Sequence, residues 1–310
     1  WDLQVFFNRL RNVLHQQSPD VIYSFMGTPN VLSVLSRLFI PSTRIVWGVR
    51  ASNMDLDRYD WLSRWNYWLE CRLARFADTI ITNSQAGLEY AVAQGFPEKR
   101  VKVIHNGIDT KQFKLDKEAG KRLRRTWGVT DDQKLIGLVA RIDPMKDHPT
   151  FLKTAALIKQ REPNARFVCV GKGNSGFGES MHNLATELGL DDVLIWARRC
   201  SDMVAVYNAF DIAVSSSYGE GFPNVIGEAM ACGVPCVVTD VGDSALLIGE
   251  TGIVVPPNDS GALFCALDEM LSLGPTRYRS LAVAARERVE SRFALDNLVN
   301  ATEDVLCGLK

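Results

Sequence analysis

Residues 215–240 read SSSYGEGFPNVIGEAMACGVPCVVTD and place a glycine-rich turn and two glutamates between two apolar runs. The first run, residues 211–216, is short and ends in small polar residues, as a buried parallel strand does. Pro223 suits the start of a helix, where no N–H donor is needed, and Gly233 ends the helix that we expect over residues 224–232. The stretch predicts strand, turn, helix and strand, with N–H groups at the helix start that can bind an anion.

The two glutamates, Glu220 and Glu228, make this turn more specific than an ordinary glycine loop. A glycine-rich turn before a helix is common, and alone it is weak evidence for a phosphate site. Glu228 is flanked by apolar or small residues, so the helix is expected to be largely buried, and a buried carboxylate requires a partner. A ribose diol can donate two hydrogen bonds to it, and the alternative is a solvated helix position.

The run EGFPNVIGEAMACGVPCVVTD, followed by TGIVVPPND, resembles the E-x7-E signature of retaining, nucleotide-sugar-dependent glycosyltransferases of family 4, which have the GT-B fold. The resemblance implies an α/β protein with two Rossmann-like, doubly wound parallel sheets. It also implies transfer of a hexose from a UDP- or GDP-sugar to a hydroxyl acceptor, a sugar or a lipid-linked sugar, in the synthesis of cell-surface polysaccharide or glycolipid. No metal ion or other cofactor is implied.

The same resemblance assigns roles to residues at the ends of the expected strands. It implies that Glu228 binds the ribose diol, that Arg141 and Lys146 stabilise the departing β-phosphate, and that Glu220 lies near the sugar. Without the glutamate motif, a solvated basic loop would explain the two cations better. The implied catalytic residues are Glu220, Arg141 and Lys146, and the implied substrate-binding residues are Glu228, Gly221, Phe222, Pro223, Asn224, Val225, Gly171 and Arg199.

Gly171 and Arg199 have the weakest support in this set. Gly171 ends an expected strand, where the missing side chain allows close backbone approach, and a plain turn explains it almost as well. Arg199 follows the next expected strand, near the position where the family holds the nucleotide base.

Strands alternate with helices along the whole chain, which indicates parallel sheets. Six apolar runs after residue 134 predict a complete second sheet, with its ligand at the carboxyl ends of the strands. Four runs predict the first sheet: residues 20–25, 44–49, 79–82 and 101–104. We place a first domain at residues 1–112, a second at 113–290, and a helix at 291–310 that the resemblance returns to the first domain.

The first domain is short for its family. Four strands are few, and none of their loops carries the glycine-rich loop that the family places near the acceptor. We therefore expect that the opening part of this domain is absent from the chain. A nucleotide-sugar-binding fragment without transfer activity remains an alternative, as does an epimerase or a phosphorylase of the same fold.

Composition excludes several other classes of protein. The net charge of -1 gives no reason to expect nucleic acid as a partner. Seven cysteines without regular spacing indicate reduced thiols rather than a disulfide framework, and with them a cytoplasmic protein. Asp55 and Asp57 spell a DxD motif before an expected helix, where an acidic cluster favourable to the helix dipole explains them better than a metal site.

Residues 59–76 (YDWLSRWNYWLECRLARF) allow two interpretations. Three tryptophans interleaved with arginines suggest peripheral contact with an anionic lipid surface on the inner face of a membrane, or with a lipid-linked sugar. The apolar stripe of Leu62, Leu69, Leu73 and Phe76 instead fits a helix packed on its own sheet, and this is the interpretation that we favour.

Overall fold

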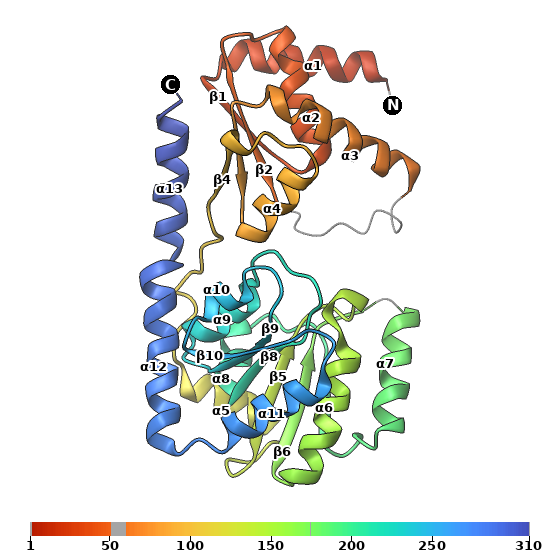
Figure 1. Ribbon diagram of the computed structural model, residues 1–310, viewed down its shortest axis with the longest axis vertical. Helices are drawn as coiled ribbons and strands as arrows, with labels where there is room; N and C mark the ends of the chain where they lie inside the picture. The colour runs from red at the N-terminus through yellow and green to blue at the C-terminus, as the bar shows by residue number, and fades with distance from the viewer. Residues whose placement is uncertain (1, 51–59, 174, 310) are drawn as a thin grey trace. The chain divides into compact units, whose positions relative to one another are not determined.

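The computed structural model describes residues 2–50, 60–173 and 175–309, and the chain divides into two compact units (Figure 1). The first unit comprises Trp1–His105 and Leu298–Lys310, and the second comprises Asn106–Asn297. Each unit is built around one parallel sheet.

The first unit holds a four-stranded parallel sheet in the order β1-β2-β3-β4. All four predicted runs form its strands, which are β1 (Val21–Phe25), β2 (Arg44–Val49), β3 (Thr79–Thr82) and β4 (Val101–Val103). Its helices are α1 (Leu3–Gln17), α2 (Gly27–Leu35), α3 (Trp61–Leu73), α4 (Gln85–Ala93) and most of α13 (Leu295–Cys307), with short 3-10 turns η1 (Ser36–Leu38), η3 (Ala74–Phe76) and η4 (Glu98–Arg100).

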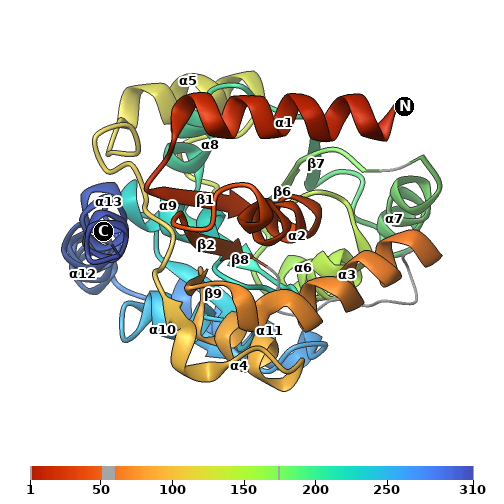
Figure 2. The same ribbon diagram turned by 90° about the horizontal axis from the view of Figure 1, so that it is seen from above.

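Helices cover both faces of this first sheet. On one face, side chains of α2, η3 and α4 pack with Ile45 and Trp47. On the other, Leu298 and Val305 of α13 pack around Val46. Figures 1 and 2 show α13 on one side of the sheet and α2 and α3 on the opposite side. The apolar stripe of the C-terminal helix therefore completes the core of the first unit.

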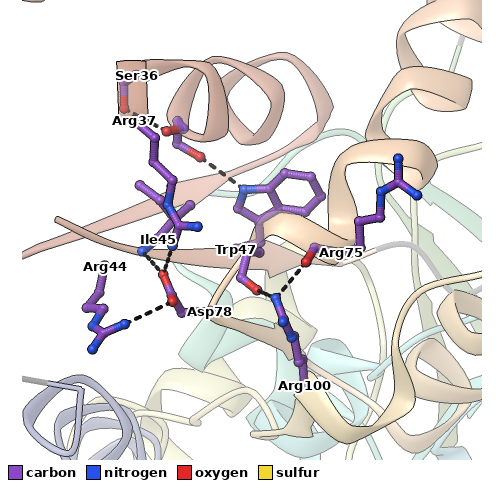
Figure 3. Close-up of polar contacts among 10 residues, drawn as sticks. Ser36, Arg37, Arg44, Ile45, Trp47, Arg75, Asp78 and Arg100 are labelled. Atoms are coloured by element: carbon purple, nitrogen blue, oxygen red, sulfur yellow. Dashed lines mark hydrogen bonds and ion pairs between the residues drawn. The ribbon is translucent and has the colours of Figure 1, made fainter. Parts of the chain in front are cut away.

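A polar cluster fixes the turn that follows α3 (Figure 3). The carboxylate of Asp78 accepts a hydrogen bond from the Ile45 N–H at 2.7 Å and forms an ion pair with Arg37. One nitrogen of Arg100 donates to the carbonyl oxygens of Arg75 and Ala77, both at 2.6 Å. These bonds link η3 and the residue after it to Arg100, just before β4, and so hold the turn against the sheet.

The second unit holds a six-stranded parallel sheet in the order β10-β9-β8-β5-β6-β7. Its strands, which match the six predicted runs, are β5 (Lys134–Val139), β6 (Ala165–Val170), β7 (Leu194–Ala197), β8 (Ile212–Ser215), β9 (Cys236–Thr239) and β10 (Gly252–Val255). Its helices are α5 (Lys117–Thr126), α6 (His148–Arg161), α7 (Ser175–Glu187), α8 (Met203–Ala209), α9 (Asn224–Ala231), α10 (Ser244–Ile248), α11 (Ser260–Leu271) and α12 (Pro275–Arg292), with the 3-10 turn η5 (Pro144–Lys146).

Two hydrophobic clusters cover the two faces of the second sheet. Side chains of α8, α9, α10 and α12 form one, and side chains of α6, α7 and α11 form the other. Every residue of β8 and β9 is buried, as expected for central parallel strands covered on both faces. The short helix α10 was not predicted.

The order of the strands reverses direction once in this sheet. From β5 the chain adds β6 and β7 on one side, and then returns to add β8, β9 and β10 on the other. The loops that follow β5 and β8 therefore leave the sheet in opposite directions. Ligands of open α/β sheets bind at the carboxyl edge of such a reversal point.

The favoured interpretation of residues 59–76, a helix packed on its own sheet, is confirmed for part of the predicted stripe. Leu73 packs against the core of the first unit and Leu69 is half-buried, whereas Leu62 and Phe76 are 56% and 43% exposed. The buried side of α3 and η3 also carries Tyr67, Glu70 and Ala74. The carboxylate of Glu70 accepts a hydrogen bond from the side chain of Asn30 at 2.7 Å, which adds a polar contact that the pattern did not predict.

Candidate functional site

The loop after β5 brings Lys146 back to the end of β8. Asp143 caps the 3-10 turn η5 by accepting a hydrogen bond from the Met145 N–H at 3.0 Å. The hydroxyl of Ser216, just beyond β8, donates to the carbonyl oxygen of Lys146 at 3.0 Å. The backbone of Lys146 is thereby tied to the neighbouring strand.

Lys146 and Glu220 form an ion pair at the reversal point of the second sheet. The Nζ of Lys146 lies 2.5 Å from Oε1 of Glu220, and the hydroxyl of Ser217 donates to the same oxygen at 2.7 Å. Their side chains are only 21% and 11% exposed, so the pair is poorly screened by water. This arrangement holds an ammonium group in a fixed position where an anionic ligand would bind.

The loop after β9 supports the loop that carries Glu220. Gly242 has a φ of +55°, and a Cβ atom there would lie 2.3 Å from the carbonyl oxygen of Glu220. The Asp243 N–H donates to the carbonyl oxygen of Gly221 at 2.9 Å. Only glycine combines this backbone conformation with so close an approach, so Gly242 lets the two loops pack together.

Residues 221–225 contribute backbone rather than side chains to the site. Phe222 is buried, and its ring centroid lies 5.4 Å from that of Phe293. Pro223 stands at the N-cap of α9, which has no side-chain cap hydrogen bond. Asn224 is exposed and accepts a hydrogen bond from the side chain of Asn106 at 3.0 Å, and Val225 packs at the edge of the core. The positive end of the helix dipole is therefore without a capping side chain.

Glu228 lies in the largely buried helix α9, as predicted. Its Oε2 accepts a hydrogen bond from the hydroxyl of Tyr207 at 2.6 Å, while its Oε1 has no hydrogen-bond partner among the residues that the structure describes. Burial raises the pKa of Glu228, and the hydrogen bond from Tyr207 opposes that rise. One carboxylate oxygen is thus held by the protein, and the other remains for a ligand.

The other three predicted residues lie at the same edge of the sheet. Arg141 and Arg199, after β5 and β7, are exposed and pair with no described carboxylate. A Cβ atom on Gly171 would lie 1.9 Å from the carbonyl oxygen of Ala140. The need for glycine at position 171 therefore comes from packing between the loops after β5 and β6.

The structure brings some of the predicted residues together and leaves others apart. Lys146 and Glu220 are in direct contact, whereas no hydrogen bond joins Glu228, Arg141 or Arg199 to that pair within the described ranges. Tyr207, Ser217 and Gly242 were not among the predicted site residues. The sequence carried a signal only for Gly242, which follows a predicted strand by a few residues.

The described residues can be searched for a metal site and for a membrane-spanning helix. In residues 2–50, 60–173 and 175–309, no three His, Cys, Asp or Glu side chains are placed to hold a metal ion. Asp55, Asp57 and Tyr59 lie outside the described residues. None of the described helices combines the length and the apolar character needed to cross a membrane.

Family models of glycosyltransferases match both units. The model described as Glycosyltransferase Family 4 matches residues 2–112, and the model described as Glycosyl transferases group 1 matches residues 133–272.

Curated relatives carry glycosyltransferase names. The D-inositol 3-phosphate glycosyltransferase of Mycobacterium sp. (strain JLS) is 32% identical over 216 residues, which are 67% of this chain and 48% of that protein. D-inositol 3-phosphate glycosyltransferase 2 of Catenulispora acidiphila is 34% identical over 242 residues, 74% of this chain and 56% of that protein. The chain thus spans about half the length of the curated relatives that it matches.

Solved structures share the fold. Anabaena Alr3699/HepE in complex with UDP has a TM-score of 0.87 at 23% identity, covering 97% of this chain and 81% of that chain. Sucrose-phosphate synthase from Thermosynechococcus elongatus has a TM-score of 0.83 at 22% identity, and the match covers 98% of this chain and 77% of that chain. These likenesses confirm the predicted fold class, two Rossmann-like units with parallel sheets.

Proposed function

This chain is a glycosyltransferase family 4-like protein of the GT-B fold, and on that premise we propose that it transfers a hexose from a nucleotide diphosphate sugar to a hydroxyl acceptor with retention of configuration. The observation that carries the proposal is the Lys146–Glu220 pair, held at the reversal point of the second sheet near the start of α9. A fixed ammonium group beside an uncapped helix N-terminus favours a diphosphate ligand.

In this proposal, Glu228 binds the nucleoside. Its Oε2 is held by Tyr207, and its Oε1 accepts hydrogen bonds from the ribose diol. Arg199 and Gly171 line the base and phosphate ends of the donor at the same edge of the sheet. Solved relatives of the same fold were crystallised with UDP and with UDP-glucose, which makes uridine donors the first to test.

The chemical step breaks the bond between the anomeric carbon and the β-phosphate oxygen, and the electron pair leaves with the nucleoside diphosphate. Lys146 and Arg141 stabilise the negative charge that develops on this oxygen, without a metal ion. The acceptor hydroxyl oxygen forms the new bond to the anomeric carbon on the face from which the diphosphate departs, and the hydroxyl proton passes to the departing β-phosphate oxygen. Glu220 positions the Lys146 ammonium, and the backbone of residues 221–225 orients the sugar hydroxyls. Preorganised charge of this kind typically contributes about 2.7 to 4 kcal/mol per group to catalysis.

The proposals for the acceptor and for the cellular setting are supported only by the resemblance to the family. We propose a sugar or lipid-linked sugar acceptor, in polysaccharide or glycolipid synthesis, at the cytoplasmic face of a membrane. Peripheral membrane contact through residues 59–76 rests instead on the exposed tryptophans and arginines of α3.

Nucleotide release from a panel of UDP- and GDP-hexoses tests the proposal. The chain is incubated with each donor and a set of simple glycosides, in the presence of EDTA, and the anomeric configuration of any product is read by NMR. We expect release from one donor class, undiminished by EDTA, and a product with the configuration of the donor. Binding without transfer, an inverted product, or activity that returns only with added manganese or magnesium would contradict the proposed reaction.

Glu228→Gln tests the role of the ribose ligand. Losing charge-assisted hydrogen bonds to the diol costs about 1.5 to 3 kcal/mol, so donor affinity should fall roughly 10- to 150-fold by calorimetry. Glu187→Gln, an exposed glutamate at the end of α7, is the matched control and should bind normally. Equal affinity in the Glu228 variant and the control would exclude this role.

A further inference from the structure

The outer face of α3 carries a row of exposed tryptophans. Trp61, Trp65 and Trp68 are 77%, 54% and 51% exposed. Their spacing of four and three residues places them on one face of the helix. Three large aromatic side chains on the solvent side of one short helix are more than scattered surface hydrophobics.

Arginines share this face with the tryptophans. Arg64, Arg72 and Arg75 are exposed, and none forms an ion pair with a carboxylate in the part of the chain that the structure describes. The Arg72 guanidinium lies 5.1 Å from the centroid of the Trp68 ring. Figure 3 shows the Arg75 side chain directed away from its own carbonyl group, to which Arg100 donates. The face is therefore both aromatic and cationic.

The face of α3 opposite the tryptophans packs on the first unit. Tyr67 and Glu70 on that face are 8% and 6% exposed, and Asn30 donates to Glu70 at 2.7 Å. At the start of the helix, Asp60 accepts a hydrogen bond from the Ser63 N–H at 2.7 Å. These contacts hold the aromatic row on the solvent side of the helix.

A cavity of about 440 Å³ lies between this face and the end of α4. Its lining includes Arg64, Trp68, Arg72 and the backbone turn at Gln94 and Gly95. Gly95 has a φ of +90°, and no neighbouring side chain or strand lies within 4 Å of the place where its Cβ would be. The cavity is therefore open to solvent at this turn. Two guanidinium groups on one concave surface can bind a phosphate in bidentate fashion.

We propose that the outer face of α3 binds the surface of a membrane that contains anionic phospholipid, with the phosphate of one headgroup in the Arg64–Arg72 cavity. Indole rings prefer the headgroup level of a bilayer, because one end of the ring is apolar and the other is a hydrogen-bond donor. Arginines that pair with no described carboxylate lie beside them and complement the negative charge of the lipid. This inference uses only the first unit and does not depend on the proposed transfer reaction.

Flotation of the 310-residue chain with vesicles tests the proposal. Vesicles of phosphatidylcholine alone are compared with vesicles that also contain phosphatidylglycerol, at low and high salt. We expect flotation only with phosphatidylglycerol, reduced by salt, together with quenching of tryptophan emission by brominated lipid. Absence of flotation, or equal flotation with neutral vesicles, would overturn the proposal.

Two pairs of variants locate the contact. Arg64→Gln/Arg72→Gln/Arg75→Gln should lower binding roughly 100-fold, since each arginine contributes about fivefold at an anionic surface. Arg122→Gln/Arg125→Gln/Arg279→Gln removes three exposed arginines of the second unit and should leave binding nearly unchanged. Trp61→Ser/Trp65→Ser should reduce quenching to the share that comes from Trp68, whereas Leu246→Ser/Val283→Ser, at exposed positions 42% and 51% accessible, should leave quenching unchanged. Equal losses in a variant and its control would refute a specific surface.

Two further measurements distinguish other occupants of this face. Soluble glycerol phosphate should not displace the protein from vesicles at millimolar concentration, and displacement would mean a site for a free anion instead. Size-exclusion chromatography should show that the arginine variant and the parent chain elute alike. A dimer that the arginine substitutions dissociate would mean that a second copy of the chain covers this face, and the membrane proposal would be wrong.

Discussion

The two sheets are built from the same repeat of strand and helix, and they differ in the order of their strands. In the first, the described strands follow one another as β1-β2-β3-β4, so successive loops leave the carboxyl edge in the same direction. In the second, the chain reverses between β7 and β8, and the loops after β5 and β8 diverge. The Lys146–Glu220 pair lies at that divergence, so strand order, rather than composition, places the candidate site.

Each unit also contains a largely buried glutamate, and the two are used differently. Burial raises the pKa of both Glu70 and Glu228, and each accepts a hydrogen bond from one side chain. Glu70 is 6% exposed and belongs to a polar network in which Asn30 also accepts a hydrogen bond from Ser24 at 2.8 Å. Glu228 keeps one oxygen without a described partner. The first carboxylate fixes a helix, and the second is available to a ligand.

Lys146→Met is expected to have the largest effect. Loss of the preorganised cation should lower the transfer rate by about 10²- to 10³-fold. Lys159→Met is the matched control, because Lys159 also lies 2.5 Å from a carboxylate, that of Asp192, which is 68% exposed. This pair lies at the end of α6 and just before β7, at the amino edge of the sheet, opposite the candidate site. Steady-state kinetics on both variants checks the difference, and a comparable loss in the control would mean that the pair at the reversal point has no special role.

Acid should destabilise the second unit through His148. This histidine is fully buried, neither ring nitrogen has a hydrogen-bond partner in the described ranges, and burial lowers its pKa to about 4. The unfolded chain binds the proton near pH 6.5, so stability is complete above that pH and is lost as the pH falls toward 4, by about 3 kcal/mol.

Urea denaturation at pH 7 and pH 4.5 measures this loss. His148→Leu removes the titrating group at similar volume, and its stability should change much less between the two pH values. A variant as acid-sensitive as the parent chain would assign the effect to other groups.

Tyr207→Phe should weaken donor binding about 5- to 10-fold, equivalent to roughly 1 to 1.4 kcal/mol, because Tyr207 orients the carboxylate and does not itself bind the donor. The tyrosine bond opposes the rise in the pKa of Glu228, so its removal raises that pKa further. Donor binding requires the ionised carboxylate. The pH below which donor affinity falls should therefore be higher in the variant than in the parent chain. Calorimetry across pH 4 to 8 checks both effects, and an unchanged acidic limb would show that Tyr207 has only a packing role.

Glu70→Gln should have the smallest effect, and only on stability. The pKa of Glu70 is raised by burial, so its contribution to stability is complete below the unfolded value of about 4.3 and is lost as the pH rises through the folded value. The advantage of the glutamine variant should therefore grow from pH 4 to pH 8 in urea denaturation. Donor affinity should be unaffected. A change in donor affinity would show that Glu70 also contributes to ligand binding, contrary to the difference drawn between Glu70 and Glu228.

Much of the fold could be predicted from local patterns. All ten apolar runs became strands, because central parallel strands are continuous and buried and their ends carry glycine or small polar residues. The E-x7-E motif placed Glu220 and Glu228 correctly at the turn and inside α9. The resemblance supplied Lys146, and the structure pairs it with Glu220.

The features that the sequence did not predict depend on contacts between segments that are distant in the sequence. Tyr207 reaches Glu228 across 21 residues, and nothing in the run VAVYNAF marks its hydroxyl as a partner. The apolar stripe wrongly predicted burial of Leu62 and Phe76, and it gave no sign of the hydrogen bond from Asn30 to Glu70, which spans 40 residues of sequence. Such pairings follow from the order of the strands, which periodicity does not specify.

We infer that the second unit alone carries the nucleotide site, because Lys146, Glu220 and Glu228 all lie within it. Titration with UDP checks this inference. The fragment Asn106–Asn297, once shown by circular dichroism to be folded, and the 310-residue chain are each titrated in a calorimeter. We predict affinities within about threefold of each other, and a loss of roughly 10- to 150-fold in both on Glu228→Gln. A folded fragment that fails to bind UDP while the whole chain binds it, or binding that is indifferent to Glu228, would contradict the claim.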